Sequence, residues 1–152
     1  MNRLVTLFFL TIFLGLPCRG AHAAASGTPD EAQAMVERAA VLMRDLGPER
    51  AFAEISNPRG PFMYRDLYVT VLDAHGVIRA HGALPHMVGH NAWNWRDADD
   101  KFYIREIIAH AWRGETGPVD YLRLHPHTRQ LRVKYTWFRR VGDYVIACGA
   151  FK

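Results

Sequence analysis

The chain has 152 residues, of which 49% are hydrophobic and 22% are charged, with 19 Lys and Arg against 15 Asp and Glu. This length and composition favour one globular domain and exclude a disordered, collagen-like or coiled-coil protein. Two cysteines are too few for a disulfide framework or a multi-cysteine zinc site, and the formal charge of +4 comes from scattered basic residues. We therefore expect no cofactor and no nucleic-acid partner.

Residues 1–23 have the pattern of a secretory signal peptide. Arg3 precedes a mainly apolar run over residues 4–16, and the small residues Ala21 and Ala23 predict cleavage after Ala23. The run is shorter than the roughly 20 residues that a membrane-spanning helix needs, which disfavours a retained anchor. The sequence thus predicts a periplasmic or extracellular product, with residues 24–152 as a single domain. Cleavage leaves Cys148 as the one thiol, which we expect to be buried in the core.

Three helices are predicted in the exported part. The first covers residues 29–46, because Thr28 and Glu31 have the spacing of a capping box and apolar residues recur every three or four positions. A short second helix follows at 48–55. The third spans 101–113 and ends before Gly114, with Asp99 or Asp100 expected to cap its start.

Five strands are predicted, at residues 67–73, 77–83, 119–125, 131–141 and 143–151. Short loops at 74–76, 126–129 and 142–143 are typical of hairpins between antiparallel neighbours. The order of elements predicts an α+β, PAS-like fold. In it, a five-stranded antiparallel sheet carries the long N-terminal helix on one face and a loop-helix segment, residues 84–113, on the other.

Histidines offer one candidate site. His81, His86 and His90 are close in sequence and His110 lies on the following helix, so a metal-dependent enzyme is one hypothesis. The four-residue step from His86 to His90 contains Gly89, which favours a loop, and no Glu follows His86 as the metalloprotease motif requires. Histidines in the core or in solvent explain the pattern better, and no nucleophile motif is present. The sequence does not call for an enzyme.

The strand at 131–141 offers a second candidate. Alternation places Leu131, Val133, Tyr135 and Trp137 on one face, which we expect to be core, and Arg132, Lys134, Thr136 and Phe138 on the other. The cationic face is either the solvated outer face of the sheet or the wall of a pocket under the loop-helix segment. In the pocket hypothesis Lys134 pairs with a ligand carboxylate. Hydroxyls for hydrogen bonds come from Tyr68, Thr70, Tyr121 and Thr136, and Trp95 or Trp93 closes the site.

Dispersed motifs cover nearly all of the exported chain. They include Leu67-Tyr68-Val69 with Gly76-Val77, Ala80-His81-Gly82 with Asn91, Gly117 with Val119-Asp120-Tyr121, Lys134 with Thr136, and Asp143-Tyr144-Val145-Ile146 with Cys148-Gly149. Together they resemble the secreted single Cache domains, which are extracellular PAS-like sensor modules. One departure is Asp97-Ala98-Asp99-Asp100, where the family often has an acidic-Pro-acidic-Gly turn.

The resemblance implies a sensor fold with a small-molecule pocket between the sheet and the loop-helix segment. Family members commonly bind small organic acids, amino acids or related metabolites, and many precede a transmembrane helix and a signalling domain. Because this chain ends at Lys152, we expect a separate membrane-bound receptor or kinase as signalling partner, and a homodimer is a further candidate assembly. The rival hypothesis is a structural or interaction protein with no ligand.

Overall fold

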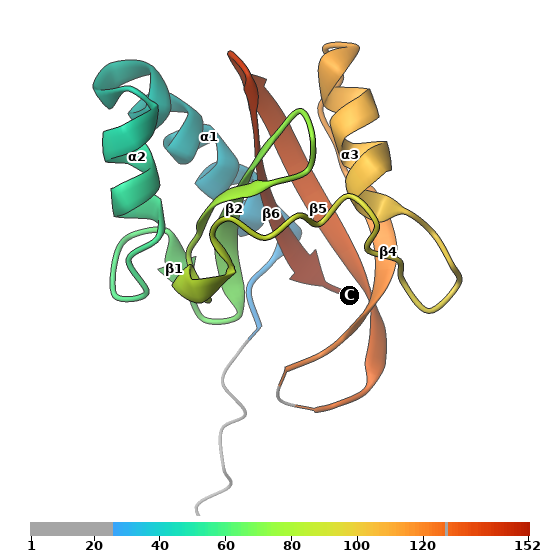
Figure 1. The fold of residues 1–152 in the computed structure, drawn as a ribbon. Helices are drawn as coiled ribbons and strands as arrows, with labels where there is room; N and C mark the ends of the chain where they lie inside the picture. Colours follow the sequence, from blue (N-terminus) through green and yellow to red (C-terminus); the bar gives the residue numbers. More distant parts are fainter. Residues whose placement is uncertain (1–25, 127) are drawn as a thin grey trace, which may run out of the picture.

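A computed structural model describes residues 26–126 and 128–152, so the predicted signal peptide and its cleavage site lie outside the described residues. Within these two ranges, no helix has the length and hydropathy of a membrane span. The helices are α1 (Pro29–Leu46), α2 (Pro48–Ile55), the short η1 (Pro85–Met87) and α3 (Tyr103–Trp112); the strands are β1 (Met63–Tyr64), β2 (Leu67–Asp73), β3 (Ile78–His81), β4 (Val119–Leu124), β5 (Leu131–Val141) and β6 (Tyr144–Phe151) (Figure 1).

The sheet is antiparallel throughout, with the strand order β3, β2, β6, β5, β4. The two-residue strand β1 adds to the beginning of β2 and was not predicted, because so short a segment has no periodicity to detect. The last strand, β6, lies in the middle of the sheet and pairs with β2 on one side and β5 on the other. The predicted α+β fold with five main antiparallel strands is confirmed.

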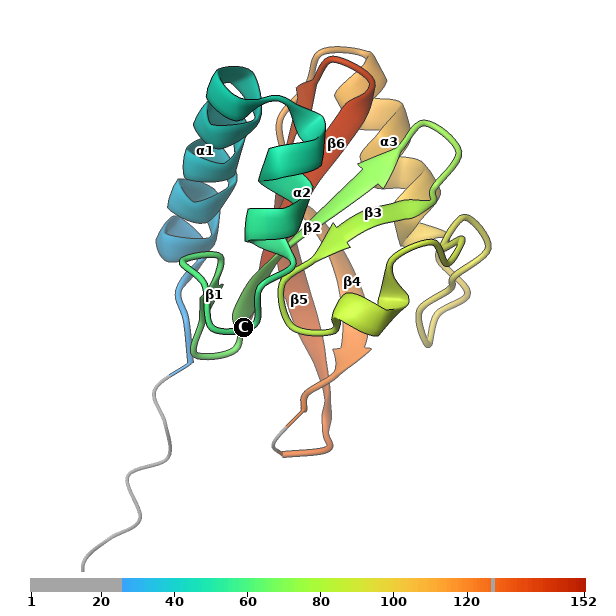
Figure 2. The ribbon, with the colours of Figure 1, turned by 60° about the vertical axis from the view of Figure 1, so that its left-hand side comes forward.

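Helices α1 and α2 cover one face of the sheet (Figure 2). The predicted capping box begins α1: the Glu31 N–H donates to the Thr28 hydroxyl at 3.2 Å, and the Thr28 N–H donates to the Glu31 carboxylate at 2.8 Å. One stripe of α1 is buried against β5 and β6, with a smaller contact to β2, and includes Met35, Val36 and Met43. Cys148, which is 2% exposed, belongs to this core, as expected.

Helix α3 and the segment before it cover the other face, where a second core forms around Ile107, Phe138 and Val145. The cap prediction for α3 was wrong. Phe102 is the residue before the helix and makes no side-chain cap. Instead, the Asp97 carboxylate accepts backbone N–H groups of Asp99, Lys101 and Leu122 at 2.9, 2.9 and 3.0 Å. Asp97, rather than Asp99 or Asp100, therefore holds the turn before α3 to strand β4.

The predicted core face of β5 is only partly confirmed: Trp137 packs against the core under α1, but Leu131 does not. The face with Leu131 is the more open one, since Leu131 is 56% exposed, whereas Lys134, Thr136 and Phe138 on the opposite face are 3%, 4% and 2% exposed. Leu131 lies at the end of the β4–β5 hairpin, which extends past the helices (Figure 1). The solvated-face interpretation of Lys134 is therefore wrong, because the loop-helix segment buries it.

Candidate functional site

A cavity of about 100 Å³ lies between the sheet and the loop-helix segment. A space of this size takes a few water molecules or one small organic molecule. Strands β2 and β3, the loop after β3, α3, and strands β4 to β6 all contribute to its wall. The lining residues include Tyr68, Thr70, His81, Trp95, Tyr103, Ile107, Tyr121, Arg123, Lys134, Thr136 and Gly149.

Six of the seven residues predicted for the pocket line this cavity, namely Lys134, Tyr68, Thr70, Tyr121, Thr136 and Trp95. Trp93 does not. It borders a shallow surface hollow with His75 and Asn91, and its backbone binds elsewhere: its N–H donates to the Asn91 side chain at 2.8 Å and its carbonyl accepts from Arg105 at 3.0 Å. The two tryptophans of the loop therefore have different positions, which their spacing alone could not reveal.

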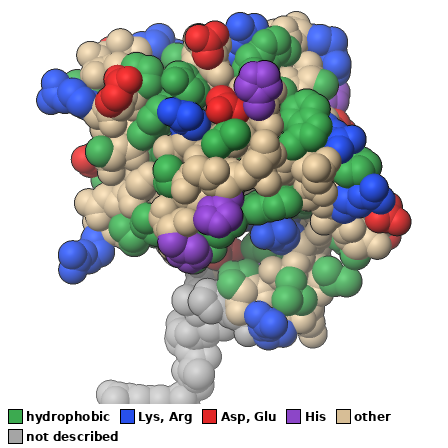
Figure 3. Space-filling view, in the orientation of Figure 1, with side chains coloured by type: hydrophobic (Ala, Val, Ile, Leu, Met, Phe, Trp, Pro, Cys, Tyr) green, Lys and Arg blue, Asp and Glu red, His purple; other side chains and the backbone are tan. Residues whose placement is uncertain are grey.

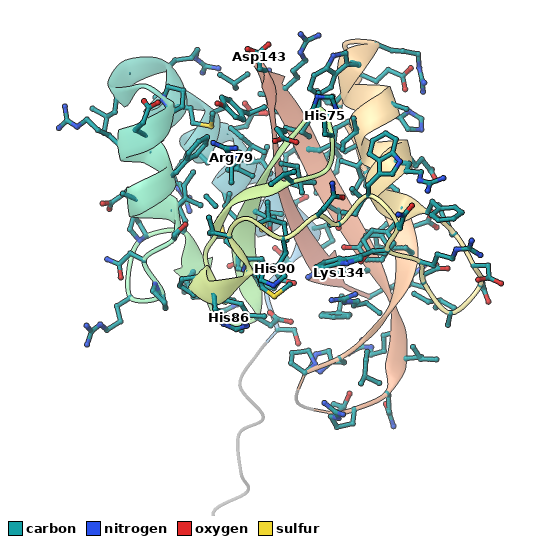
Figure 4. All side chains as sticks on the ribbon, in the orientation of Figure 1. His75, Arg79, His86, His90, Lys134 and Asp143 are labelled. Atoms are coloured by element: carbon teal, nitrogen blue, oxygen red, sulfur yellow. The ribbon has the colours of Figure 1, made fainter. Side chains whose placement is uncertain are left out.

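Lys134 is the charged group at the centre of the site. It lies on the face of the sheet covered by the loop-helix segment (Figure 4). Its ammonium donates to the Tyr68 hydroxyl at 3.3 Å and lies 4.3 Å from the Tyr68 ring centroid and 5.0 Å from that of Phe151. Among the described residues, no Asp or Glu lies within ion-pair distance of it. A buried cation without an anionic partner is costly, which marks this lysine as a ligand-binding candidate.

Strand register gathers the hydroxyl groups around Lys134. Tyr121 on β4 is directly opposite Lys134, and the Thr136 hydroxyl, two residues along β5, donates to the Tyr121 hydroxyl at 3.1 Å. Burial raises the pKa of Tyr121, so its phenol stays neutral. The Lys134 ammonium lowers the pKa of Tyr68. Burial by itself lowers the pKa of Lys134, but its interactions in the cavity, among them the hydrogen bond to the Tyr68 hydroxyl, outweigh burial and the net pKa lies above the ordinary value, so the ammonium is charged at neutral pH.

His81 belongs to the cavity, although the sequence connected it only with a metal site. Its ring stacks on Tyr68 with centroids 4.8 Å apart. Burial, helped by the charge of Lys134, lowers the pKa of His81 to about 4, so the imidazole is neutral at pH 7. Because Nδ1 accepts the Leu84 N–H at 3.0 Å, this neutral ring carries its proton on Nε2. His81 therefore adds a neutral donor to the site.

Arg123 is a second cationic residue that the sequence analysis missed. It is exposed at the rim of the cavity, where it donates to the Tyr103 hydroxyl at 3.1 Å and lies 5.8 Å from the Trp95 ring centroid. Tyr103 in turn stacks on Tyr121 at 4.0 Å. The two-residue period of a strand was the available signal, because it places Arg123 on the same face as Tyr121.

The structure separates the histidines of the metal hypothesis. His81 is buried in the cavity, whereas His86 and His90 are exposed on η1 and the turn after it. Figure 4 labels both residues, and Figure 3 shows histidine side chains at the surface in the same orientation. His110 binds Glu115 at the end of α3. Within the described residues, no three His, Cys, Asp or Glu side chains are placed to hold a metal ion. The turn at Gly89 (φ 89°) keeps residues 86 and 90 off a common helix face, which corrects the proposed group.

Solved structures of sensor domains share this architecture. A methyl-accepting chemotaxis protein from Vibrio parahaemolyticus is 17% identical with a TM-score of 0.67, and the alignment covers 80% of this chain and 86% of that one. A periplasmic sensor domain of a chemotaxis protein is 19% identical (TM-score 0.60; 80% and 88% covered). A Cache chemosensory domain described for carboxylic acid recognition is 18% identical (TM-score 0.61; 80% and 86% covered).

At these identities the likeness shows the fold, and it agrees with the PAS-like architecture expected from the sequence. A search of curated proteins found no match. A family model, single Cache domain 2, matches residues 21–151 and so includes every strand and helix described above. This chain belongs to the single Cache domain 2 family.

Proposed function

We propose that this protein is an exported, non-enzymatic sensor module that binds a small organic acid in the cavity and acts through a separate membrane-bound receptor or kinase. The observation that carries the proposal is Lys134: a cation 3% exposed, facing a cavity, with no acidic partner among the described residues. A ligand carboxylate would supply the missing anion and accept hydrogen bonds from the hydroxyls of Tyr68 and Tyr121.

The cavity wall favours an organic acid over an amino acid. None of the described lining residues is Asp or Glu. An α-ammonium group would therefore find no counter-charge there and would be repelled by Lys134 and Arg123. The solved Cache domain described for carboxylic acid recognition supports the same choice of ligand chemistry.

Two further observations support a binding role and export. Burial raises the pKa of Cys148 to about 12, which keeps its thiol protonated and unreactive, so the cavity offers no activated nucleophile among the described residues. The signal-peptide pattern of residues 1–23 supports export, and one solved neighbour is a periplasmic sensor domain. The open cavity disfavours the alternative of a ligand-free interaction protein with its pocket filled by side chains.

The test is ligand binding by the protein purified from expression of the full-length sequence. Thermal-shift and calorimetric titrations would compare butyrate, succinate, alanine and ethylamine at constant ionic strength. A bound acid at a hundred times its Kd adds about 2.7 kcal/mol of stability, which raises Tm by several degrees. We expect carboxylic acids to stabilise the protein and the amine and amino acid to leave Tm unchanged.

Two lysine variants make the test specific. Lys134→Met should weaken acid binding at least about 30-fold, since removing one partner of a buried charge pair costs about 2 kcal/mol or more. Lys101→Met is the matched control, because Lys101 is paired with Glu106 and Asp120 outside the cavity. Equal affinities in Lys134→Met and the wild type, or a response to the amine alone, would contradict the proposal.

A further inference from the structure

Two positively charged side chains line the cavity, and the described residues of its wall include no Asp or Glu. Arg123 at the rim has as its contacts the neutral Tyr103 hydroxyl and the face of Trp95, and it forms no ion pair with a described acidic residue. Lys134 further inside is likewise without an acidic partner in the described chain. One carboxylate at Lys134 would leave the charge of Arg123 uncompensated.

The register of β4 and β5 places a third positive charge next to Arg123. Arg123 is directly opposite Arg132, and the next pair on the same face is Tyr121 with Lys134. Like charges directly opposite on a sheet are destabilising. The Arg132 guanidinium has the main-chain oxygen of Lys152 as its partner, whereas Arg123 has no ionic partner among the described residues. An anion bound at the rim would relieve this repulsion.

We propose that Arg123 is a second anion-binding residue and that the ligand is a short dicarboxylate rather than a monocarboxylate. This inference rests on the proposed function, because it assumes that Lys134 binds the first carboxylate. Arg123 is two residues along β4 from the partner of Lys134, a separation of about 6.7 Å between Cα atoms. A short dicarboxylate spans such a distance with one end in the cavity and the other at its rim.

The position of Arg123 suits it to the outer end of such a ligand. Its present partner, Tyr103, offers a neutral hydroxyl, and a carboxylate would replace that bond by a charge-assisted one with bidentate geometry. Burial raises the pKa of Tyr103, so the phenol does not ionise to act as the anion itself. The Arg123 guanidinium also lies over the ring of Trp95, which gives it a flat aromatic surface to stack on.

The test compares butyrate with succinate, which share a carbon chain and differ by one carboxylate. Calorimetric titration of the protein from full-length expression should give at least tenfold tighter binding for succinate. Arg123→Gln should weaken succinate about tenfold and change butyrate less than twofold. Arg44→Gln is the control: like Arg123→Gln it removes one positive charge, but on the exposed side of α1, so it should leave both affinities unchanged. Arg123→Lys should recover part of the succinate affinity, and Tm reports whether each variant folds.

The outcomes separate this inference from the proposed function. If butyrate binds as tightly as succinate, or if Arg123→Gln weakens both acids equally, the dicarboxylate inference is overturned while carboxylate binding at Lys134 stands. If neither acid binds, or if Lys134→Met binds both as well as the wild type, the proposed function fails and the inference fails with it.

Discussion

The ammonium of Lys134 on β5 donates to the hydroxyl of Tyr68 on β2 at 3.3 Å, although the residues are 66 positions apart and β6 lies between their strands. The contact crosses β6 at Gly149, which also lines the cavity. A Cβ at this position would lie 2.4 Å from the Thr136 hydroxyl and 2.6 Å from Cε of Lys134. The missing side chain of Gly149 therefore gives Lys134 room to reach Tyr68.

Gly149→Ala should lower carboxylate affinity at least about tenfold, because the added methyl displaces the Lys134 side chain, and overpacking should also cost about 1–3 kcal/mol of stability. Calorimetry and thermal unfolding measure the two effects. Gly142→Ala is the control: Gly142 has φ 57° and no atom near its Cβ position, so it should lose stability and keep its affinity. Unchanged affinity in Gly149→Ala would contradict the role given to the glycine.

The buried neutral His81 should make stability depend on pH. Its folded pKa of about 4 lies below the ordinary 6.5, so the unfolded chain binds more protons between these values and stability falls as pH drops through the window. The loss reaches about 3 kcal/mol at pH 4. Urea unfolding of wild type and His81→Phe, which keeps a ring against Tyr68, should diverge by this amount between pH 7 and pH 4. Parallel curves would show that His81 does not titrate as described.

Trp95 and Trp93 should respond differently to truncation. Trp95→Ala removes a wall of the cavity and should weaken ligand binding about tenfold, equivalent to roughly 1.4 kcal/mol. Trp93→Ala removes a partly buried ring 5.6 Å from the Arg105 guanidinium, which should lower Tm without changing affinity. Equal losses of affinity in the two variants would assign both rings to the site.

Asp97 should stabilise the segment before α3 more than its neighbours do. Asp97→Ala leaves three backbone N–H groups without their acceptor and should cost about 2 kcal/mol. Asp99→Ala is the comparison, because Asp99 is exposed and accepts no hydrogen bond within the described chain; its stability should change by less than about 0.5 kcal/mol. Desolvation by itself raises the pKa of Asp97, but the three backbone hydrogen bonds together outweigh it and the net pKa is lowered. The stabilisation by Asp97 should therefore be present above the ordinary pKa of an aspartate and be lost as the pH falls below it. Similar losses in both variants would contradict this assignment.

Sequence patterns correctly predicted those structural features that depend on residues close together in the chain. The capping box at Thr28 and Glu31 and the glycine stop at Gly47 define α1 within one element, and the predicted bounds agree with the structure. The two-residue alternation of β5 likewise placed Lys134, Thr136 and Phe138 on one face. Such features depend on neighbours a few positions away, which a sequence displays directly.

The burial of the Lys134 face and the set of residues around it depend on contacts between segments far apart in the chain. Whether the Lys134 face is solvated or buried depends on the loop-helix segment lying over it, and no periodicity within β5 encodes that cover. The same packing turned Trp95 toward the cavity and Trp93 away, and it brought His81 and Arg123 beside Lys134.

By itself, the sequence determined the helices, the main strands and the cationic face of β5, because backbone propensity and side-chain alternation act over short distances. Only the tertiary structure decided that this face closes into a cavity and which charges share it. The reason is that burial, pKa and ion pairing depend on side chains that strand pairing and helix packing bring together from the whole length of the chain.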